Sequence, residues 1–462
     1  MFNKPTDTPA PRAGESFTIV TATGGITGTF GNAYTFQGVL RPELTYGPNS
    51  ITALLRAGSL VTILDGQNPT AIAFANALDT LRTGFYDKLW NLYGNVDWMN
   101  GAQLNATFSA LSPANMIGET ELLQDRQSRQ LFGNVSDRLS LLGTGQATGM
   151  SFSGGAMPLM RGSSDVSPQA VLGLNSSSRS IAVPMGGGLS GFVTMSGDNA
   201  RSSYGDQRGF SAGQHGRYYA TGVEAPFGKV RLGTAVGYAE SLSQAGLDSA
   251  RSKLTQAAAY ASVPLGGNAY FGAVVAAEQA RSTSNRIGTD TVSNFRLNGA
   301  THSSRYMATA EAGFRTGLGH GLSLNPRAQL GYSRYSLDGF REEGGETALE
   351  LNSLKVNRLE ARFGAKLDGT TQFGSWTVTP QLQADYVRLV SGGRNGLNVS
   401  FAAAPDYAFA LPLTNGASGW AEVKGGVSMS RGAFTLGLSG QATAGDAPIS
   451  DQRGLVSFSV KF

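Results

Sequence analysis

The chain contains no cysteine among its 462 residues, which excludes disulfide frameworks, thiolate metal sites and cysteine nucleophiles. Charged residues make up only 15% of the chain, and the net charge of +4 is spread thinly along it. The sequence therefore has no cluster of basic residues of the kind that binds nucleic acid. No apolar run reaches the roughly 18 residues that a transmembrane helix requires. The first residues, MFNKPTDTPAPRAGESF, lack the apolar core of a signal peptide. If the protein is exported, its signal lies upstream, and we expect that Met1 is not the natural start.

Enzyme motifs are also missing from the sequence. No G-x-S-x-G hydrolase motif occurs, and GLSGQ at 437–441 fails at its last position. The three histidines fall at expected strand ends or loops, where a histidine is far more often plain surface than a ligand or base. The sequence therefore predicts no catalytic residue, no cofactor site and no metal site.

Glycine is abundant, with 63 residues, about twice the usual frequency. From about residue 190 to the end, apolar and polar residues alternate in segments of roughly ten residues. In RYMATAEAGFR, for example, Tyr306 and Phe314 fall on the opposite face from Glu311 and Arg315. About twelve such segments begin near residues 191, 216, 229, 252, 268, 305, 322, 354, 375, 418, 432 and 453.

Alternation is also typical of a soluble β-sandwich, which buries one face of each sheet. Here the polar faces mix charges of both signs with many glycines, and aromatic residues gather at segment ends. Both features favour a membrane barrel with a crowded interior and two aromatic girdles. We predict an all-β fold, a twelve-stranded antiparallel transmembrane β-barrel over residues 191–462, closed because hydrocarbon cannot hydrogen-bond an open strand edge. The charged residues predicted to face its interior are Glu311, Arg315, Glu360, Arg362, Asp385 and Glu422.

Three further regions precede the predicted barrel. Residues 1–66 carry short β-branched runs separated by glycine and proline, which predicts a small all-β piece. Residues 67–142 have helical spacing, and their last part, 115–142, places Leu131 and other apolar residues on one stripe with charges around the remainder. That helix would cross a bilayer's thickness, but its charges exclude contact with lipid. Residues 143–190 are rich in glycine and serine and are predicted to form a linker.

The order of these parts resembles the translocator region of bacterial autotransporters, the type Va secretion proteins. The likeness is carried by a β-helix-like passenger end (GGITGTF, LTYGPNSI), a helical stretch (NPTAIAFANALDTL, LSPANM), a charged helix (ETELLQDRQSRQLFGNVSDRL) and a twelve-strand barrel ending in LVSFSVKF. The resemblance implies a non-enzymatic outer-membrane translocator, monomeric and without cofactors, which exports an N-terminal passenger and displays it on the cell surface. Outer-membrane lipid, the insertion machinery, periplasmic chaperones and its own passenger are the implied partners.

The resemblance also implies roles for two sets of residues. The alternating apolar residues at the C-terminus look like the assembly signal that the outer-membrane insertion machinery reads: Val456, Phe458, Val460 and Phe462. The charged helix looks like the segment that plugs the pore, with four charged residues placed against the polar interior: Asp125, Arg126, Arg129 and Arg138. Because the linker 143–190 is long for the family, the helix could instead lie outside the pore.

Two other functions remain open on the sequence. A porin-like small-solute channel would have the same barrel with a conducting interior. A surface adhesin anchored by the barrel would bind a partner directly through its displayed N-terminal residues.

Overall fold

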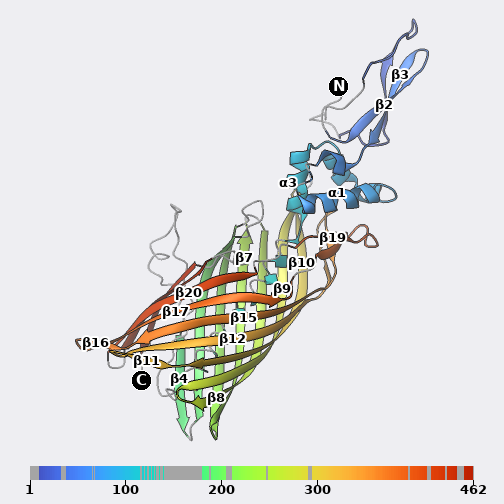
Figure 1. Ribbon diagram of the computed structural model, residues 1–462. Helices are drawn as coiled ribbons and strands as arrows, with labels where there is room; N and C mark the ends of the chain where they lie inside the picture. Colours follow the sequence, from blue (N-terminus) through green and yellow to red (C-terminus); the bar gives the residue numbers. More distant parts are fainter. Residues whose placement is uncertain are drawn as a thin grey trace.

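The computed structural model describes residues 10–32, 38–64, 66, 68–114, single positions between 117 and 139, and most of 179–460. The gaps in the last range are 187–188, 204–210, 246–247, 290–293, 394–395, 414–417, 432–433 and 445–451. The chain forms a curled antiparallel sheet, a helical unit at one end of that sheet, and a small N-terminal sheet beyond the helices (Figure 1).

The curled sheet is built from long strands, each paired antiparallel with the next long strand along the chain. Its order is β22-β21-β20-β17-β15-β12-β10-β9-β8-β7-β6-β5-β4, and the short strands β11 (Thr316–Gly319) and β16 (Thr371–Phe373) pair with β12 and β17. The long strands are β4 (Arg179–Gly186), β5 (Leu189–Ser203), β6 (Ser211–Phe227), β7 (Val230–Ala245), β8 (Asp248–Gly266), β9 (Ala269–Thr289), β10 (Asn294–Phe314), β12 (Leu322–Leu337), β15 (Leu354–Gly369), β17 (Trp376–Ser391), β20 (Gly419–Arg431), β21 (Phe434–Ala444) and β22 (Gln452–Val460).

Each of the predicted segments falls on one long strand from β5 to β22. The structure adds β4, which lies inside the stretch predicted as a linker, 143–190, so that prediction is wrong for Arg179–Gly186. The β-branched residues Ile181 and Val183 and the glycines that follow suit a hairpin with β5. β22, at the other edge, approaches both β4 and β5, but no hydrogen-bonded ladder joins these edges among the described residues.

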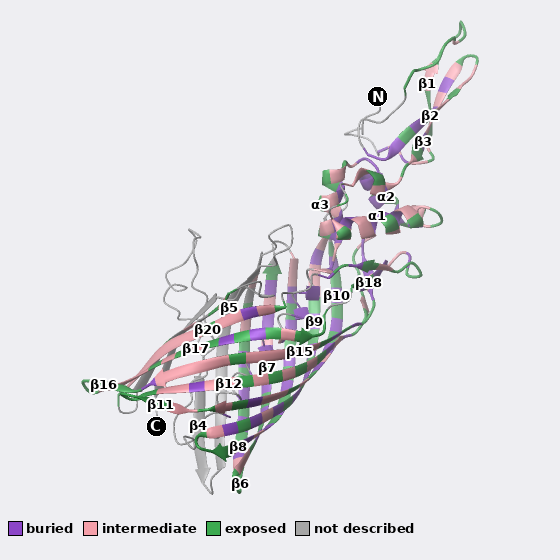
Figure 2. Cartoon of the chain, viewed as in Figure 1, coloured by how far each residue is buried: buried purple, intermediate pink, exposed green. Residues whose placement is uncertain are grey.

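The pleat of the sheet separates two faces, as the alternation predicts. On β7, Leu232 and Val236 are exposed on the outer face, whereas Ala235 and Ala239 are buried on the inner face. The same alternation of burial runs along neighbouring strands (Figure 2). The outer face of β7 is thus apolar at these positions, and the inner face of the sheet is largely shielded from solvent.

The two ends of the curled sheet differ in their connections. At the end where β10 meets β12 and β15 meets β17, the turns are short, and we call this the short-turn end. At the opposite end, the two longest connections carry a four-stranded sheet, which we call the flap. Its strands are β13 (Phe340–Arg341), β14 (Leu349–Leu351), β18 (Leu397–Phe401) and β19 (Phe409–Leu411).

The helical unit, residues 69–111, packs on the flap (Figure 1). It contains α1 (Pro69–Leu81), α2 (Trp90–Val96) and α3 (Gly101–Leu111), with the 3₁₀ turn η2 (Tyr86–Leu89) between α1 and α2 and η1 (Leu60–Ile63) before α1. Sequence explains the helix starts, since Asn68 caps α1 with Pro69 at its first position, and Asn100 and Gln103 form a capping box on α3. These helices lie within the predicted helical region.

The N-terminal sheet has the order β1-β3-β2 and is antiparallel throughout, with β1 (Ser16–Thr21), β2 (Leu40–Tyr46) and β3 (Ser50–Ala57). The expected β-helix would stack parallel strands, so that expectation does not describe these residues. The reason is local: the Gly47–Asn49 turn sequence, GPN, reverses the chain between β2 and β3 and makes a hairpin.

Arg82, at the C-terminal end of α1, forms a bidentate ion pair with Asp97, whose side chain is only 2% exposed. Burial raises the pKa of the Asp97 carboxyl, and the Arg82 guanidinium opposes this rise. We expect Arg82→Ala to destabilise the helical unit by about 3–5 kcal/mol, because it leaves a buried carboxylate unpaired.

Urea unfolding followed by tryptophan fluorescence would measure this loss, with Arg56→Ala as the control. Arg56 pairs with Glu43 on the surface, and such a pair contributes at most about 1 kcal/mol. In Arg82→Ala the folded-state pKa of Asp97 rises further above its unfolded value of about 4, so folding takes up a proton. The free energy of unfolding that the variant loses relative to the parent should therefore be smaller at about pH 4 than at about pH 7. An equal loss at both pH values would contradict this explanation.

Candidate functional site

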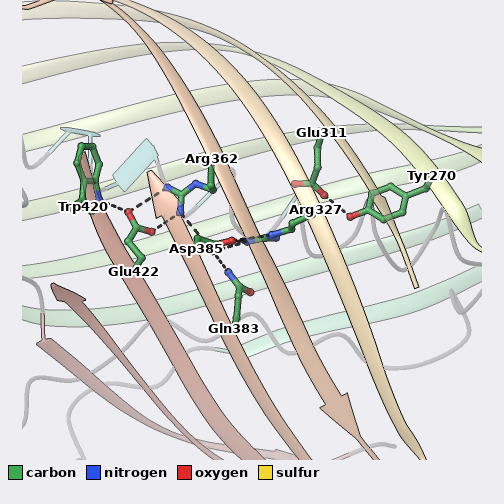
Figure 3. A network of polar contacts seen from close by, with 8 residues as sticks. All are labelled: Tyr270, Glu311, Arg327, Arg362, Gln383, Asp385, Trp420 and Glu422. Carbon is green, nitrogen blue, oxygen red and sulfur yellow. Dashed lines mark hydrogen bonds and ion pairs between the residues drawn. The ribbon is translucent and has the colours of Figure 1, made fainter. Parts of the chain in front are cut away.

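The inner face of the sheet carries a network of paired charges from four adjacent strands (Figure 3). Arg362 on β15 donates to Glu422 on β20 at 2.6 Å and lies 3.7 Å from Asp385 on β17. Arg327 on β12 donates to Asp385 at 2.9 Å. Trp420 Nε1 donates to Glu422 at 2.9 Å and completes this group. Asp385 and Glu422 are direct cross-strand partners, and the two arginines offset the repulsion between them.

A glycine makes part of this network possible. The Asp385 carboxylate reaches Arg327 across β15 by lying over Gly364, where a Cβ would meet Asp385 Oδ1 at 2.0 Å. Any side chain at 364 would therefore separate the two charges. This is one reason why glycine is frequent on the polar face of the alternating segments.

Further polar pairs extend the network along the inner face. Tyr270 Oη donates to Glu311 at 2.8 Å (Figure 3), and Arg315 forms an ion pair with Asp368. Of the six residues predicted to face the interior, five thus contact polar side chains, several of them two strands away in the sheet. Glu360 is half-buried on β15, two residues from Arg358 and Arg362 on the same face.

A helix lies against this inner wall. The described positions between 117 and 139 are helical, and almost all of them are buried. Leu131, Val135 and Leu139, spaced by four residues, form one face of the helix. They pack against the small inward side chains of four strands in a single cluster, including these residues: Ala220, Ala235, Ala239, Ala258 and Ala276.

Small residues on the wall let this helix approach closely. A Cβ on Gly272 of β9 would lie 2.8 Å from Leu139 Cδ1, so any other residue there would displace the Leu139 side chain. Ser262 Oγ on β8 also donates to the backbone carbonyl of Leu139 at 3.0 Å. The wall thus contacts both the side chain and the backbone at this end of the helix.

Polar contacts hold the other half of the helix. Arg305 on β10 is 2% exposed and donates to Asp125 Oδ1 at 2.8 Å and to the Glu121 carbonyl at 3.4 Å. Arg358 on β15 forms an ion pair with the Glu121 carboxylate. Ser128 Oγ donates to Glu278 on β9 at 2.6 Å. Charged groups of helix and wall therefore neutralise each other out of contact with bulk solvent.

Only one of the four predicted helix residues, Asp125, lies among the described residues. Asp125 faces the wall, but its partner Arg305 was not among the predicted interior residues. Arg126, Arg129 and Arg138 lie outside the described residues. Arg305 was not predicted from the sequence. It lies six residues before Glu311 on β10, and residues an even number of positions apart face the same side of a strand, so the alternation could have identified it.

The C-terminal residues are only partly described. Val456, Phe458 and Val460 lie in β22 and pair with Leu438, Leu436 and Phe434 of β21. Phe462 lies outside the described residues. In the part of the chain that the structure describes, no helix is long and apolar enough to span a membrane, and no group of three or more metal-ligating side chains is present.

Together, an antiparallel curled sheet with an apolar exterior and a charged interior defines an outer-membrane β-barrel protein. The sequence profile of the Autotransporter beta-domain matches residues 187–441, which are 255 of the 462 residues. The chain therefore belongs to the autotransporter family, whose translocator domains are transporters rather than enzymes. It is an outer-membrane protein with its N-terminal segment at the cell surface, so the flap end is the outer end.

Similar solved structures include parts of three autotransporters. The translocator domain of NalP from Neisseria meningitidis is 15% identical, with a TM-score of 0.45 over 60% of this chain and 89% of that one. The beta domain of the Bordetella autotransporter BrkA is 17% identical, with a TM-score of 0.42 over 60% and 99%. The transport unit of AIDA-I from Escherichia coli is 10% identical, with a TM-score of 0.33 over 61% and 93%. Among curated proteins, none matches.

Proposed function

We propose that this protein exports an N-terminal passenger through its own barrel and then displays it on the cell surface. The observation that carries the proposal is the path of the chain. Ile117 belongs to the core at the flap end, whereas Leu139 packs on Gly272, three residues from the start of β9 at the short-turn end. A helix over these 22 steps spans about 33 Å, the thickness of a bilayer's hydrocarbon core. A chain that has passed through a barrel from one side would be left in this position.

The proposal includes a closed barrel. An open strand edge would leave unpaired backbone groups in hydrocarbon, and each such group costs several kcal/mol. The approach of β22 to β4 and β5 supports closure. We propose that the closed wall surrounds a helix including 115–142, with Asp125, Arg126, Arg129 and Arg138 among its polar contacts.

Export is tested by placing an epitope tag before residue 10 and behind a secretory signal. In intact cells, added protease should remove the tag while the barrel remains resistant, and heating should change the barrel's gel mobility. The matched control is the same tagged N-terminal segment ending at residue 142, without the barrel, which should stay inside. A tag that remains protected in cells with a folded barrel would exclude export.

Two other functions give different results in the same cells. A porin-like channel would conduct with residues 115–142 in place and would leave the tag inside. A barrel-anchored adhesin would bring the tag out, but residues 10–111 alone would then bind a partner. The buried contacts between helix and wall favour translocation over a channel, because they fill part of the interior.

We also propose that Val456, Phe458, Val460 and Phe462 form the assembly signal recognised by the insertion machinery, after delivery by periplasmic chaperones. Deleting Phe462 should reduce the heat-modifiable barrel by about tenfold or more, if recognition loses about 1.4 kcal/mol with one aromatic anchor. Deleting Met1 is the control, since it leaves the barrel sequence intact. Equal amounts of folded barrel from both would remove the support for this signal.

A further inference from the structure

The helical unit and the flap bury one apolar core together. Helices of 13, 7 and 11 residues are marginal in water by themselves, and flap strands of 2 to 5 residues are too short for an independent sheet. Phe74 of α1 joins the two parts, with its ring 5.8 Å from Phe108, 6.0 Å from Phe401 and 5.2 Å from Phe409. Each part is therefore ordered mainly by contact with the other.

The flap also supplies the cap at the N-terminal end of α2. No side chain at the N-cap position of α2 accepts a hydrogen bond. Instead, Glu346, from the loop between β13 and β14, accepts from the backbone N–H of Leu92 at 2.9 Å and of Asn91 at 3.3 Å. A carboxylate at this place also complements the helix dipole. The helical unit thus recognises the flap through a specific polar contact as well as through apolar burial.

The flap has a firm attachment to the barrel. Arg286, near the outer end of β9, forms a bidentate pair with Glu342, and both side chains are 2% exposed. The same Glu342 accepts from the Leu349 N–H at 3.0 Å, and Asn298 of β10 bridges to Glu343. The surface that receives the helical unit is therefore held on the β9–β10 hairpin.

The docked unit leads directly into the interior helix. α3 ends at Leu111, Ile117 still belongs to the shared core, and Glu121 already pairs with Arg358 on the inner wall. Only a few residues separate the last docked helix from the first interior contact. The position of the helical unit on the flap thus sets how deep the helix sits in the barrel.

We propose that the helical unit and the flap form a latch, which closes when residues 69–111 emerge at the outer end and then holds the interior helix at its depth. The latch rests on the proposed export function. It needs no ligand, since both halves belong to this chain. Because the flap is displayed outside, the latch closes only on the exported side and opposes backward movement of the chain.

The test uses the full chain, purified and inserted in planar bilayers, with two pairs of variants. Leu411→Asp places a charge in the buried core, whereas Ala410→Asp places it on the exposed face of the same strand. Glu346→Ala removes the α2 cap, whereas Glu350→Ala removes a partly exposed carboxylate from β14 of the flap, where it lies 4.0 Å from Arg341. Heat-modifiable migration checks that each barrel is folded.

Docking is measured by a cysteine pair, which the cysteine-free chain makes selective. Phe85 and Tyr407 have ring centroids 5.1 Å apart across the two parts, so Phe85→Cys with Tyr407→Cys should react with a short thiol cross-linker. Leu411→Asp and Glu346→Ala should reduce this cross-linking, and the two controls should not. Loss of a cap shifts a docking equilibrium by about tenfold, so pore openings should become about tenfold more frequent in Glu346→Ala.

Leu411→Asp should cross-link less than the parent, but in those molecules that do cross-link, pore openings should again be as rare as in the parent protein. Loss of cross-linking without more openings would overturn the latch, and so would more openings with cross-linking intact. Should Leu411→Asp fail to fold, Glu346→Ala and its control decide the question. A barrel that stays closed when the interior helix itself is disrupted by Val135→Asp would instead count against the helix as a plug, and hence against the proposed function.

Discussion

Val135→Asp should open the pore. Val135 is fully buried between the interior helix and the wall, in an apolar cluster with several alanines, Leu254 and Val274. An unpaired buried charge costs several kcal/mol, and about 4 kcal/mol would shift the balance between seated and unseated helix by about a thousandfold. The expected result is a large rise in single-channel conductance of the purified protein in planar bilayers.

Val135→Ala is the matched control for this experiment. It removes two methyl groups and introduces no charge, so its cost is limited to the lost packing, about 1–2 kcal/mol. By the same relation this loss shifts the balance by about fivefold to thirtyfold, so conductance should rise far less than in Val135→Asp. Equal conductance of Val135→Asp and the parent, with both barrels heat-modifiable, would mean that the helix does not control the pore.

Arg305→Ala should loosen the helix from the wall by a different route. The guanidinium is 2% exposed and meets Asp125 at 2.8 Å, the Glu121 carbonyl and Ser128, so its loss leaves buried acidic groups without their cation. Removing one partner of a buried pair typically costs about 3–5 kcal/mol. We expect a lower temperature for the heat-induced shift in gel mobility, together with more frequent pore openings.

Arg251→Ala is the control, because Arg251 is 59% exposed and lies 3.7 Å from Glu240 on the neighbouring strand. Such a pair contributes at most about 1 kcal/mol. A double variant, Arg305→Ala with Asp125→Asn, should recover part of the loss, since the partly buried carboxylate of Asp125 is then neutral as well. If Arg305→Ala and Arg251→Ala behaved alike, the ion pair would not hold the helix.

Strand positions and faces were predictable because they depend on neighbours along the chain. A strand with one face toward lipid alternates with period two, so Leu232 and Val236 on one side and Ala235 on the other revealed their faces directly. The same rule placed Glu311, Arg362, Asp385 and Glu422 on the inner face. It did not find β4, since RSIAVPMG is a short segment next to a glycine-rich stretch and has little alternation.

Contacts between distant residues were beyond this kind of prediction. The prediction set Asp125 against six interior charges, but its observed partner is Arg305, and the partners of Arg362 come from the next strands of the sheet. Which charges meet depends on register, curvature and the depth of the helix. None of these quantities produces a periodic pattern of residues that could be recognised in the sequence.

The sequence by itself determined which side of each strand is apolar, where helices begin, and that a charged helix precedes the strands, because propensity, capping and alternation act over a few residues. Only the tertiary structure decided that this helix lies on the inner wall, that glycines at 272 and 364 permit close approaches, and that the helical unit and the flap share one core. The physical reason is that the contacts of the helix with the wall, and of the helical unit with the flap, require residues far apart in the sequence to meet, such as Asp125 and Arg305, which are 180 positions apart. Such meetings are selected by the shape and charge of the whole curled sheet.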